Sequence, residues 1–323
     1  MQEFGTLMLD LVTLGETCAA FVAKSGGPLR HAAEFERRIG GAESTVAAGV
    51  ARLGHRVGWI SRLGADELGE FILGVMRSEN VDVRHVTMVT GAQTGVFVRE
   101  NRSSGNSNVF YYRSTSAFTS FSPDELDEDY LGSARILHLG GITPGLSASC
   151  FAAVQRAMEI AKAREVCITF DLNYRAKVWP PEEARGPLES LMSNADHLFA
   201  GREDLFKLTG MSDQEALLDY LGSLGVPNIV LKMGADGTVW SGPDGVEHVP
   251  SIAIERAVDR FGVGDAFAAG YIAGLLRGQT GPEAVGLGNR VAGWSLQLPG
   301  NIESLPTWDE LEGMPEASDI AGR

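Results

Sequence analysis

The chain has 323 residues, of which 44% are hydrophobic and 21% are charged, a composition typical of a folded globular protein. This length suffices for two average domains or for one large α/β domain. A formal net charge of −15 argues against general binding to nucleic acids or anionic membranes, because such partners are held by clustered Lys and Arg, and the sequence has no such cluster. Any anionic ligand must therefore meet local positive charge.

The chain start and the cysteines favour a cytoplasmic protein. The segment MQEFGTLMLD has no basic leader, and Asp10 interrupts its short apolar run, so we expect no secretory signal. No apolar stretch is long enough to span a membrane. Three scattered cysteines, Cys18, Cys150 and Cys167, have apolar neighbours and form no CxxC pair, which predicts buried free thiols in a reducing compartment.

Strand-like apolar runs bounded by Gly, Asn or Asp recur from the start of the chain onward: LDLVTLG, VGWISRLG, ARILHLGG, VCITFDLN, HLFAG and NIVLKMG. Helical spacing lies between several of them, over residues 44–53, 68–79, 148–164 and 214–224. Strands that alternate with helices predict βαβ units and a mostly parallel sheet covered on both faces.

Two segments depart from this alternation. Residues 19–38 and 94–113 have alternating side chains, as in TGVFVRE and NVFYYR, and no helical stretch between them, which predicts a small accessory sheet. The last ten residues, 314–323, are small and polar and predict a flexible tail. No repeat or linker divides the rest, so we expect a single domain over residues 1–313.

The most informative segment is DRFGVGDAFAAG, residues 259–270. Gly262 and Gly264 permit a tight turn, and the small residues that follow predict a helix to about Leu276. Backbone N–H groups at such a helix start attract anions, and the same dipole favours the ionised form of Asp265. A turn with an Asp cap explains a bare GxGD pattern at least as well. A Rossmann motif is disfavoured by the late position, and no GxxxxGK[ST] occurs.

This segment resembles the second signature motif of the PfkB, or ribokinase-like, sugar kinases, DxxGAGDxFxxG, with Val263 in place of Ala. The first motif is visible in GGAESTVA at 40–47, followed by ARLG at 51–54 and GADELG at 64–69. The resemblance covers nearly the whole chain. It implies a three-layer α/β/α fold with a mostly parallel central sheet and a small β-sheet lid, and ATP-dependent phosphoryl transfer to a sugar hydroxyl.

Within the family, several segments are most similar to kinases of 2-keto-3-deoxygluconate: TGVFVRE, VFYYR, HLGGITP, FDLNYR and VLKMG. This similarity implies conversion of that sugar acid to its 6-phosphate. Two alternatives remain open, a kinase for fructose or a related keto-deoxy sugar acid, and a catalytically silent relative that binds sugar or a partner. The retained glycines and Asp265 argue against silence.

The resemblance also assigns roles to residues. Asp265 would accept the proton of the sugar hydroxyl, while N–H groups of Gly262, Val263 and Gly264 hold the transferred phosphate. The ATP side is implied to comprise Asn173, Lys232, Gly234, Gly237 and Asn289. Lys232 could instead be a strand-end lysine that reaches solvent, and Asn173 could merely cap the turn after its strand.

A magnesium ion is expected on the ATP phosphates, because hard cations prefer oxygen ligands. The family usually has NxxE before the helix that precedes a TG pair. Here Gly201 replaces the Asn and Asp204 takes the place of the Glu, which makes Asp204 the candidate metal ligand. The six histidines have no metal-ligand spacing, and His138 is expected to be a core residue.

The sugar side is implied to comprise Gly40, Gly41, Phe97, Tyr111, Arg113 and Arg175. Phe97 stands where relatives often have Tyr, and Thr45 replaces the usual Asn of the first motif. Gly41 could be a plain turn before a helix, and either arginine could be a surface residue paired with Asp or Glu. The extended lid strands offer edges that a second subunit could cover, so we expect a homo-oligomer.

Overall fold

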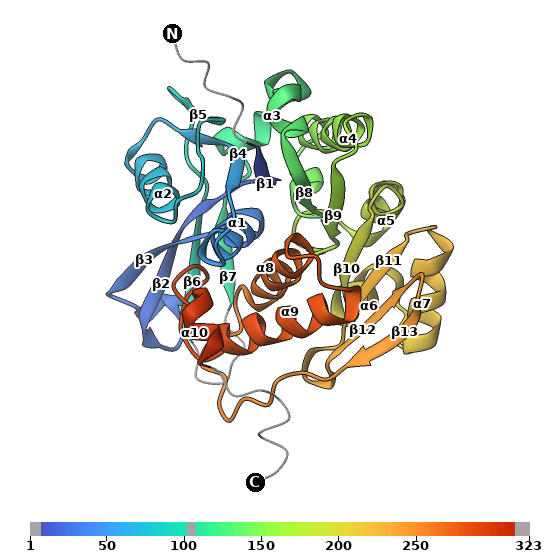
Figure 1. The fold of residues 1–323 in the computed structure, drawn as a ribbon. Coiled ribbons are helices and arrows are strands. Elements are labelled where there is room, and N and C mark those ends of the chain that lie inside the picture. Colours follow the sequence, from blue (N-terminus) through green and yellow to red (C-terminus); the bar gives the residue numbers. More distant parts are fainter. Residues whose placement is uncertain (1–7, 102–107, 314–323) are drawn as a thin grey trace.

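The computed structural model describes residues 8–101 and 108–313, and its centre is a nine-stranded sheet (Figure 1). The strand order is β13-β12-β11-β10-β9-β8-β1-β4-β5. Neighbours from β11 to β5 are parallel, whereas β12 and β13 form an antiparallel extension at one edge. The strands are β1 (Leu9–Leu14), β4 (Val57–Gly64), β5 (Val86–Val89), β8 (Ala134–Gly140), β9 (Cys167–Asp171), β10 (His197–Gly201), β11 (Asn228–Lys232), β12 (Thr238–Gly242) and β13 (Gly245–Val249).

Helices cover both faces of this sheet. Successive strand residues point to opposite faces, so Leu198 and Ala200 of β10 join one core cluster and Phe199 joins the other. One face is covered by α1 (Ala42–Arg52), α2 (Glu67–Ser78), α8 (Val263–Leu276), α9 (Gly281–Ser295) and α10 (Trp308–Glu312). The other is covered by α3 (Glu128–Gly132), α4 (Ala148–Ala163), α5 (Pro181–Met192), α6 (Arg202–Thr209) and α7 (Gln214–Ser223). The three-layer α/β/α fold with a mostly parallel sheet is therefore confirmed.

A second, four-stranded sheet has the order β3-β2-β6-β7. Its strands are β2 (Cys18–Gly26), β3 (Phe35–Gly40), β6 (Val96–Asn101) and β7 (Val109–Tyr112). The central pair, β2 and β6, is parallel, and both outer pairs are antiparallel. These strands lie in or beside the segments 19–38 and 94–113 that alternate in the sequence. Residues 1–7, 102–107 and 314–323, including the predicted tail, lie outside the described residues.

Helix α9 is not among the helical stretches that the sequence pattern predicts. Figure 1 shows α9 and α8 packed together across one face of the sheet. A Cβ atom at Gly288 would lie 2.9 Å from the Phe267 ring, and one at Gly270 would lie 2.9 Å from the Gly288 Cα. Glycine is needed here so that the two helices can approach closely.

The cysteines and His138 have structural roles. All three cysteines are free thiols, with Cys18 and Cys150 buried and Cys167 half-buried, so burial was overestimated for Cys167 alone. His138 is buried in β8, with Nδ1 2.9 Å from Oγ1 of Thr169, and belongs to the core as expected. In the described part of the chain, no helix combines the length and apolar character needed to cross a bilayer.

Candidate active site

A large cleft of ≈ 960 Å³ opens at the carboxyl ends of the parallel strands, where open α/β sheets collect ligands. Residues of the small sheet and of the start of α8 line it. Every residue that the sequence predicts for the site lines this cleft: Gly40, Gly41, Phe97, Tyr111, Arg113, Asn173, Arg175, Asp204, Lys232, Gly234, Gly237, Gly262, Val263, Gly264, Asp265 and Asn289.

The start of α8 has the geometry of an anion site. Gly262 is the N-cap residue with φ of 81°, a left-handed conformation that favours glycine. The first N–H groups of a helix have no partner within it, and here they face the cleft with the positive end of the helix dipole. The first helical bond along this segment runs from Ala266 N to Gly262 O, 2.9 Å apart. The turn can therefore offer N–H donors to a phosphate group.

Asp265 is the third residue of α8 and lies beside this anion site. Its burial is the largest influence, and together with the nearby Asp171 carboxylate it raises the pKa of Asp265 from 3.8 to about 7, although Arg175 and Lys232 oppose the rise. The expectation that the helix dipole favours the ionised form is thus wrong, because burial and a like charge outweigh the dipole. Asn173, in a left-handed conformation with φ of 33°, donates from Nδ2 to Asp265 Oδ1 at 3.4 Å.

Lys232 ends β11 and points into the cleft. Its Nζ lies 2.6 Å from Oδ2 of Asp171, and its side chain is only 18% exposed, so it does not extend into solvent. A Cβ atom built on Gly264 would lie 3.6 Å from the same Nζ. The ammonium group therefore lies next to the start of α8, where it can add positive charge to the anion site.

Close packing explains the two glycines of the first motif. A Cβ atom at Gly40 would lie 2.6 Å from Cε1 of Phe97, and one at Gly41 would lie 2.5 Å from the carbonyl oxygen of Glu16. Phe97 is 3% exposed, and its ring centroid is 5.7 Å from that of Tyr111. Thr45 turns its hydroxyl back to Gly41 O at 2.7 Å, so this departure from the family pattern does not reach the cleft.

The two predicted arginines differ in their surroundings. Arg113 is largely buried and forms an ion pair with Glu16, whose side chain is 2% exposed. Burial opposes the charged guanidinium, but Glu16 together with Cys18 and Tyr111 outweighs it, and the pKa of Arg113 is raised. Arg175 is exposed to the cleft and makes no ion pair with any residue of 8–101 or 108–313. Of the two arginines, Arg113 is therefore the one that pairs with an acidic residue, and it nevertheless lines the cleft.

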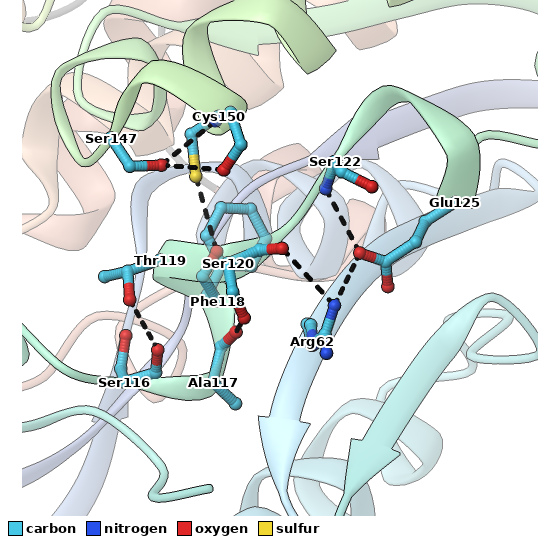
Figure 2. A network of polar contacts seen from close by, with 11 residues as sticks. Arg62, Ser116, Ala117, Phe118, Thr119, Ser120, Ser122, Glu125, Ser147 and Cys150 are labelled. Carbon is cyan, nitrogen blue, oxygen red and sulfur yellow. Dashed lines mark hydrogen bonds and ion pairs between the residues drawn. The ribbon is translucent and has the colours of Figure 1, made fainter.

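The segment that follows Arg113 is fixed by the polar network in Figure 2. Arg62 of β4 donates to Glu125 Oε1 at 2.6 Å and to the Ser120 carbonyl oxygen at 3.4 Å. Cys150 of α4 donates from Sγ to the Phe118 carbonyl oxygen at 3.3 Å. These contacts fasten the segment to both the sheet and α4, which restricts the backbone that carries Arg113.

The predicted ATP side is formed by loops around β11, β12 and α9. Gly237 has φ of 92°, and a Cβ atom there would lie 2.5 Å from the Val249 carbonyl oxygen. Asn289 lines the cleft, and its amide accepts from Thr238 Oγ1 at 3.1 Å and donates to Pro250 O at 2.9 Å. These bonds hold the wall of the cleft together and leave Asn289 in a supporting position there.

Asp204 also faces the cleft from the first turn of α6. Burial raises the pKa of its carboxyl, against the opposing influence of Arg175 and Lys232. Gly201 is the N-cap residue of this helix and supplies no side-chain cap. Over residues 8–101 and 108–313, no cluster of three or more His, Cys, Asp or Glu side chains forms a metal site by itself.

Four acidic residues that line the cleft are absent from the predicted site: Glu16, Glu43, Asp171 and Glu203. Burial, with a contribution from Asp265, raises the pKa of Glu43 to about 7. A Cβ atom at Gly15 would lie within 2.3 Å of the Glu43 carboxyl, so glycine is required there. Glu43 and Asp171 each lie inside a segment that the sequence marks, GGAESTVA and FDLNYR, but nothing in those letters shows that the carboxyls face the cleft.

Comparisons with known proteins agree with this geometry. Residues 8–308 match the pfkB family carbohydrate kinase sequence pattern, so the chain belongs to this family of sugar kinases. It is 35% identical to 2-dehydro-3-deoxygluconokinase of Bacillus subtilis (strain 168), over 94% of this chain and 95% of the relative. It is 34% identical to 2-dehydro-3-deoxygluconokinase of Thermoproteus tenax, over 98% and 97% of the two chains.

One solved structure of a similar protein contains ATP. The uncharacterized sugar kinase of Pyrococcus horikoshii in complex with ATP is 26% identical to this chain, with a TM-score of 0.81 over 96% of this chain and 99% of the other. The predicted family and its fold are therefore confirmed.

Proposed function

We propose that this protein is an ATP-dependent kinase that phosphorylates the 6-hydroxyl of 2-keto-3-deoxygluconate, the sugar acid also called 2-dehydro-3-deoxygluconate. Arg175 is the observation that carries this choice of substrate, since it offers a guanidinium to the cleft without an ion-pair partner among the described residues. A guanidinium matches a carboxylate with two parallel hydrogen bonds. The two relatives with this activity in their names support the same sugar acid.

In this proposal Asp265 is the general base. A pKa of about 7 leaves its carboxyl divided between both protonation states near neutral pH, where it can take the hydroxyl proton and release it again. The N–H groups at Gly262, Val263 and Gly264 hold the transferred phosphate, and Lys232 adds charge at the same place. Such fixed donors stabilise the charge that spreads over the phosphoryl oxygens during transfer.

ATP and Mg²⁺ fit the rest of the cleft. Asn173, Gly234, Gly237 and Asn289 line the same cleft as Asp265, and the ATP complex of the Pyrococcus relative supports the nucleotide. Asp204 supplies a carboxylate oxygen of the kind that Mg²⁺ prefers. When bound, the ion neutralises phosphate charge, and it needs only one or two protein carboxylates because phosphates complete its shell.

The two arginines contribute unequally in this proposal. The Arg113 charge is offset by Glu16, so Arg113 orients the sugar through its remaining N–H groups, whereas Arg175 recognises the carboxylate. We therefore expect Arg175→Ala to lower kcat/KM for the sugar acid by the equivalent of about 2–5 kcal/mol, with much less effect on a neutral sugar. Arg175→Lys also weakens binding, since an ammonium lacks the planar pair of donors.

The test is an ADP-release assay with 2-keto-3-deoxygluconate, its galactonate epimer and fructose. Wild type is compared with Arg175→Ala, Arg113→Ala and a surface control, Arg185→Ala, which removes an exposed contact to Glu189. Equal losses on the acid and on fructose would mean that Arg175 serves the fold or ATP. A wild-type preference for fructose refutes the acid assignment and leaves the kinase assignment intact. No turnover with any sugar favours a catalytically silent relative.

Three further expectations belong to the proposal. The small sheet acts as a lid that closes over the sugar, so ATP hydrolysis without sugar should be slow, and sugar should protect β6 and β7 from proteolysis.

The exposed aromatic residues Phe110, Tyr111 and Tyr112 on β7, the edge strand of the small sheet, support a homo-oligomer, which light scattering can test. The free thiols support a cytoplasmic location.

A further inference from the structure

A buried ion pair connects the small sheet to the loop that leads into α8. Arg99 lies on β6, and its Nη2 is 2.6 Å from Oδ2 of Asp259, which is 160 residues away in the sequence. The side chains are only 10% and 11% exposed. Asp259 is the first residue of the motif segment 259–270, and Gly262 and Gly264 follow it on the same loop, so the pair joins the sugar side of the cleft to the anion site.

Asp259 also holds the turn itself. Its Oδ1 accepts a hydrogen bond from Phe261 N at 3.0 Å, and its Oδ2 accepts a second one from Gly300 N at 3.3 Å. Phe261 directly precedes Gly262, the left-handed N-cap of α8. Any displacement of the Asp259 carboxylate would therefore be passed to the backbone that supplies the phosphate-binding N–H groups.

Apolar contacts run in parallel with this ion pair. The Arg99 guanidinium carbon lies 5.0 Å from the centroid of the Phe261 ring, and the Phe97 ring centroid is 5.7 Å from that of Phe261. Phe97 in turn contacts Tyr111 on the neighbouring strand. Strand β6 thus touches the turn through both a charged and an aromatic contact, and β7 packs behind it through Tyr111.

Fold stability alone is a poor explanation for such a pair. Removing two charges from water is costly, and well-packed apolar residues of similar volume often stabilise a protein as well or better. A buried pair does, however, fix its partners in one relative position. We propose that Arg99, acting through Asp259, is a positioning residue that holds the turn of residues 261–264 in register with the sugar side of the cleft. This inference rests on the proposed function of that turn as the phosphate site.

The test replaces Arg99 with Met, which keeps much of the volume and removes the charge. Lys24→Met on the same sheet is the matched control, because it removes an exposed pair, with Nζ of Lys24 3.6 Å from Oε2 of Glu34. We expect kcat to fall by about 10²-fold in Arg99→Met, the loss typical of a small misplacement of reacting groups, with KM for sugar and ATP changed only a few-fold. Lys24→Met should match wild type.

Amide hydrogen exchange provides a readout that does not depend on activity. In the ligand-free protein, the hydrogen-bonded amides of the turn, Phe261 N (to Asp259) and Ala266 N (to Gly262 O), should exchange faster in Arg99→Met than in wild type or Lys24→Met. Unchanged exchange in this turn overturns the proposal, even if kcat falls. The Asp265→Asn variant tests the proposed chemistry separately. If the kinase assignment is wrong, turnover measurements on that variant show it, and the exchange result can still be interpreted.

The double variant Arg99→Met/Asp259→Asn distinguishes positioning from simple stabilisation. It leaves no unpaired buried charge, and the Asn oxygen can still accept from Phe261 N, so thermal stability should return toward that of wild type. If Arg99 positions the turn, kcat remains low because the connection to β6 is still missing. Recovery of kcat together with stability would show that the pair serves only the fold, and the proposal would be wrong.

Discussion

Replacing Asp265 with Asn should abolish turnover and at the same time stabilise the ligand-free protein above neutral pH. The amide keeps the shape and the contact with Asn173 but cannot accept the hydroxyl proton. Removal of a general base costs about 10²–10⁴-fold in rate. In wild type, kcat/KM should rise with pH and level off above about 7, where the Asp265 carboxyl is ionised in the folded protein.

The stability effect follows from the raised pKa. Below pH 3.8 the Asp265 carboxyl is protonated in both the folded and unfolded states, so it contributes no pH dependence there. Between 3.8 and about 7 the folded state binds the proton more tightly, and wild-type stability therefore falls as pH rises. The raised pKa can lower the unfolding free energy of wild type by at most about 4 kcal/mol, because each pKa unit is worth about 1.4 kcal/mol. Asn carries no charge and escapes this cost.

The assay is urea unfolding of ligand-free wild type, Asp265→Asn and the exposed control Asp219→Asn at pH 5 and pH 8.5. Asp265→Asn should exceed wild type in unfolding free energy by roughly 1–4 kcal/mol at pH 8.5 and by much less at pH 5. Asp219→Asn should show no such difference. An Asp265→Asn variant that is no more stable than wild type at pH 8.5 would refute the electrostatic reasoning, and near-normal turnover would refute the role as base.

Three other perturbations follow from the same cleft. Lys232→Met leaves the Asp171 carboxylate buried without its partner, so the unfolding free energy should drop by about 3–5 kcal/mol in urea titrations. The double variant Lys232→Met/Asp171→Asn should recover stability but not turnover. Recovery of both stability and turnover would exclude a role for the ammonium group in catalysis. Gly41→Ala places a Cβ atom 2.5 Å from the Glu16 carbonyl oxygen, so the midpoint of thermal unfolding should fall and KM for sugar should rise. An unchanged midpoint and KM would mean that the backbone shifts here at little cost. Removal of divalent ions with EDTA should stop ADP release and added Mg²⁺ should restore it, and turnover that persists in EDTA would contradict the expected metal requirement.

Local patterns in the sequence determined much of this protein. The alternation of apolar runs with helical spacing predicted the parallel sheet and its covering helices, because burial on both faces of a parallel strand leaves a short, continuous apolar run. The spacing of glycines around Asp265 predicted the turn and helix at 259–276, because only glycine adopts the left-handed conformation of Gly262 without strain. The same patterns gave no prediction of α9, where glycines allow close contact with α8.

The charge pairs in and next to the cleft were decided only by tertiary structure. Arg113 meets Glu16, Lys232 meets Asp171, and Arg99 meets Asp259, each across a large separation in sequence. Local periodicity reports whether a side chain is buried, but the partner of a buried charge depends on which strand ends the crossovers bring to one edge of the sheet. For the same reason the sequence favoured an ionised Asp265, since the helix dipole is local, whereas the burial and the Asp171 carboxylate that raise its pKa arise only when separate strands and α8 assemble.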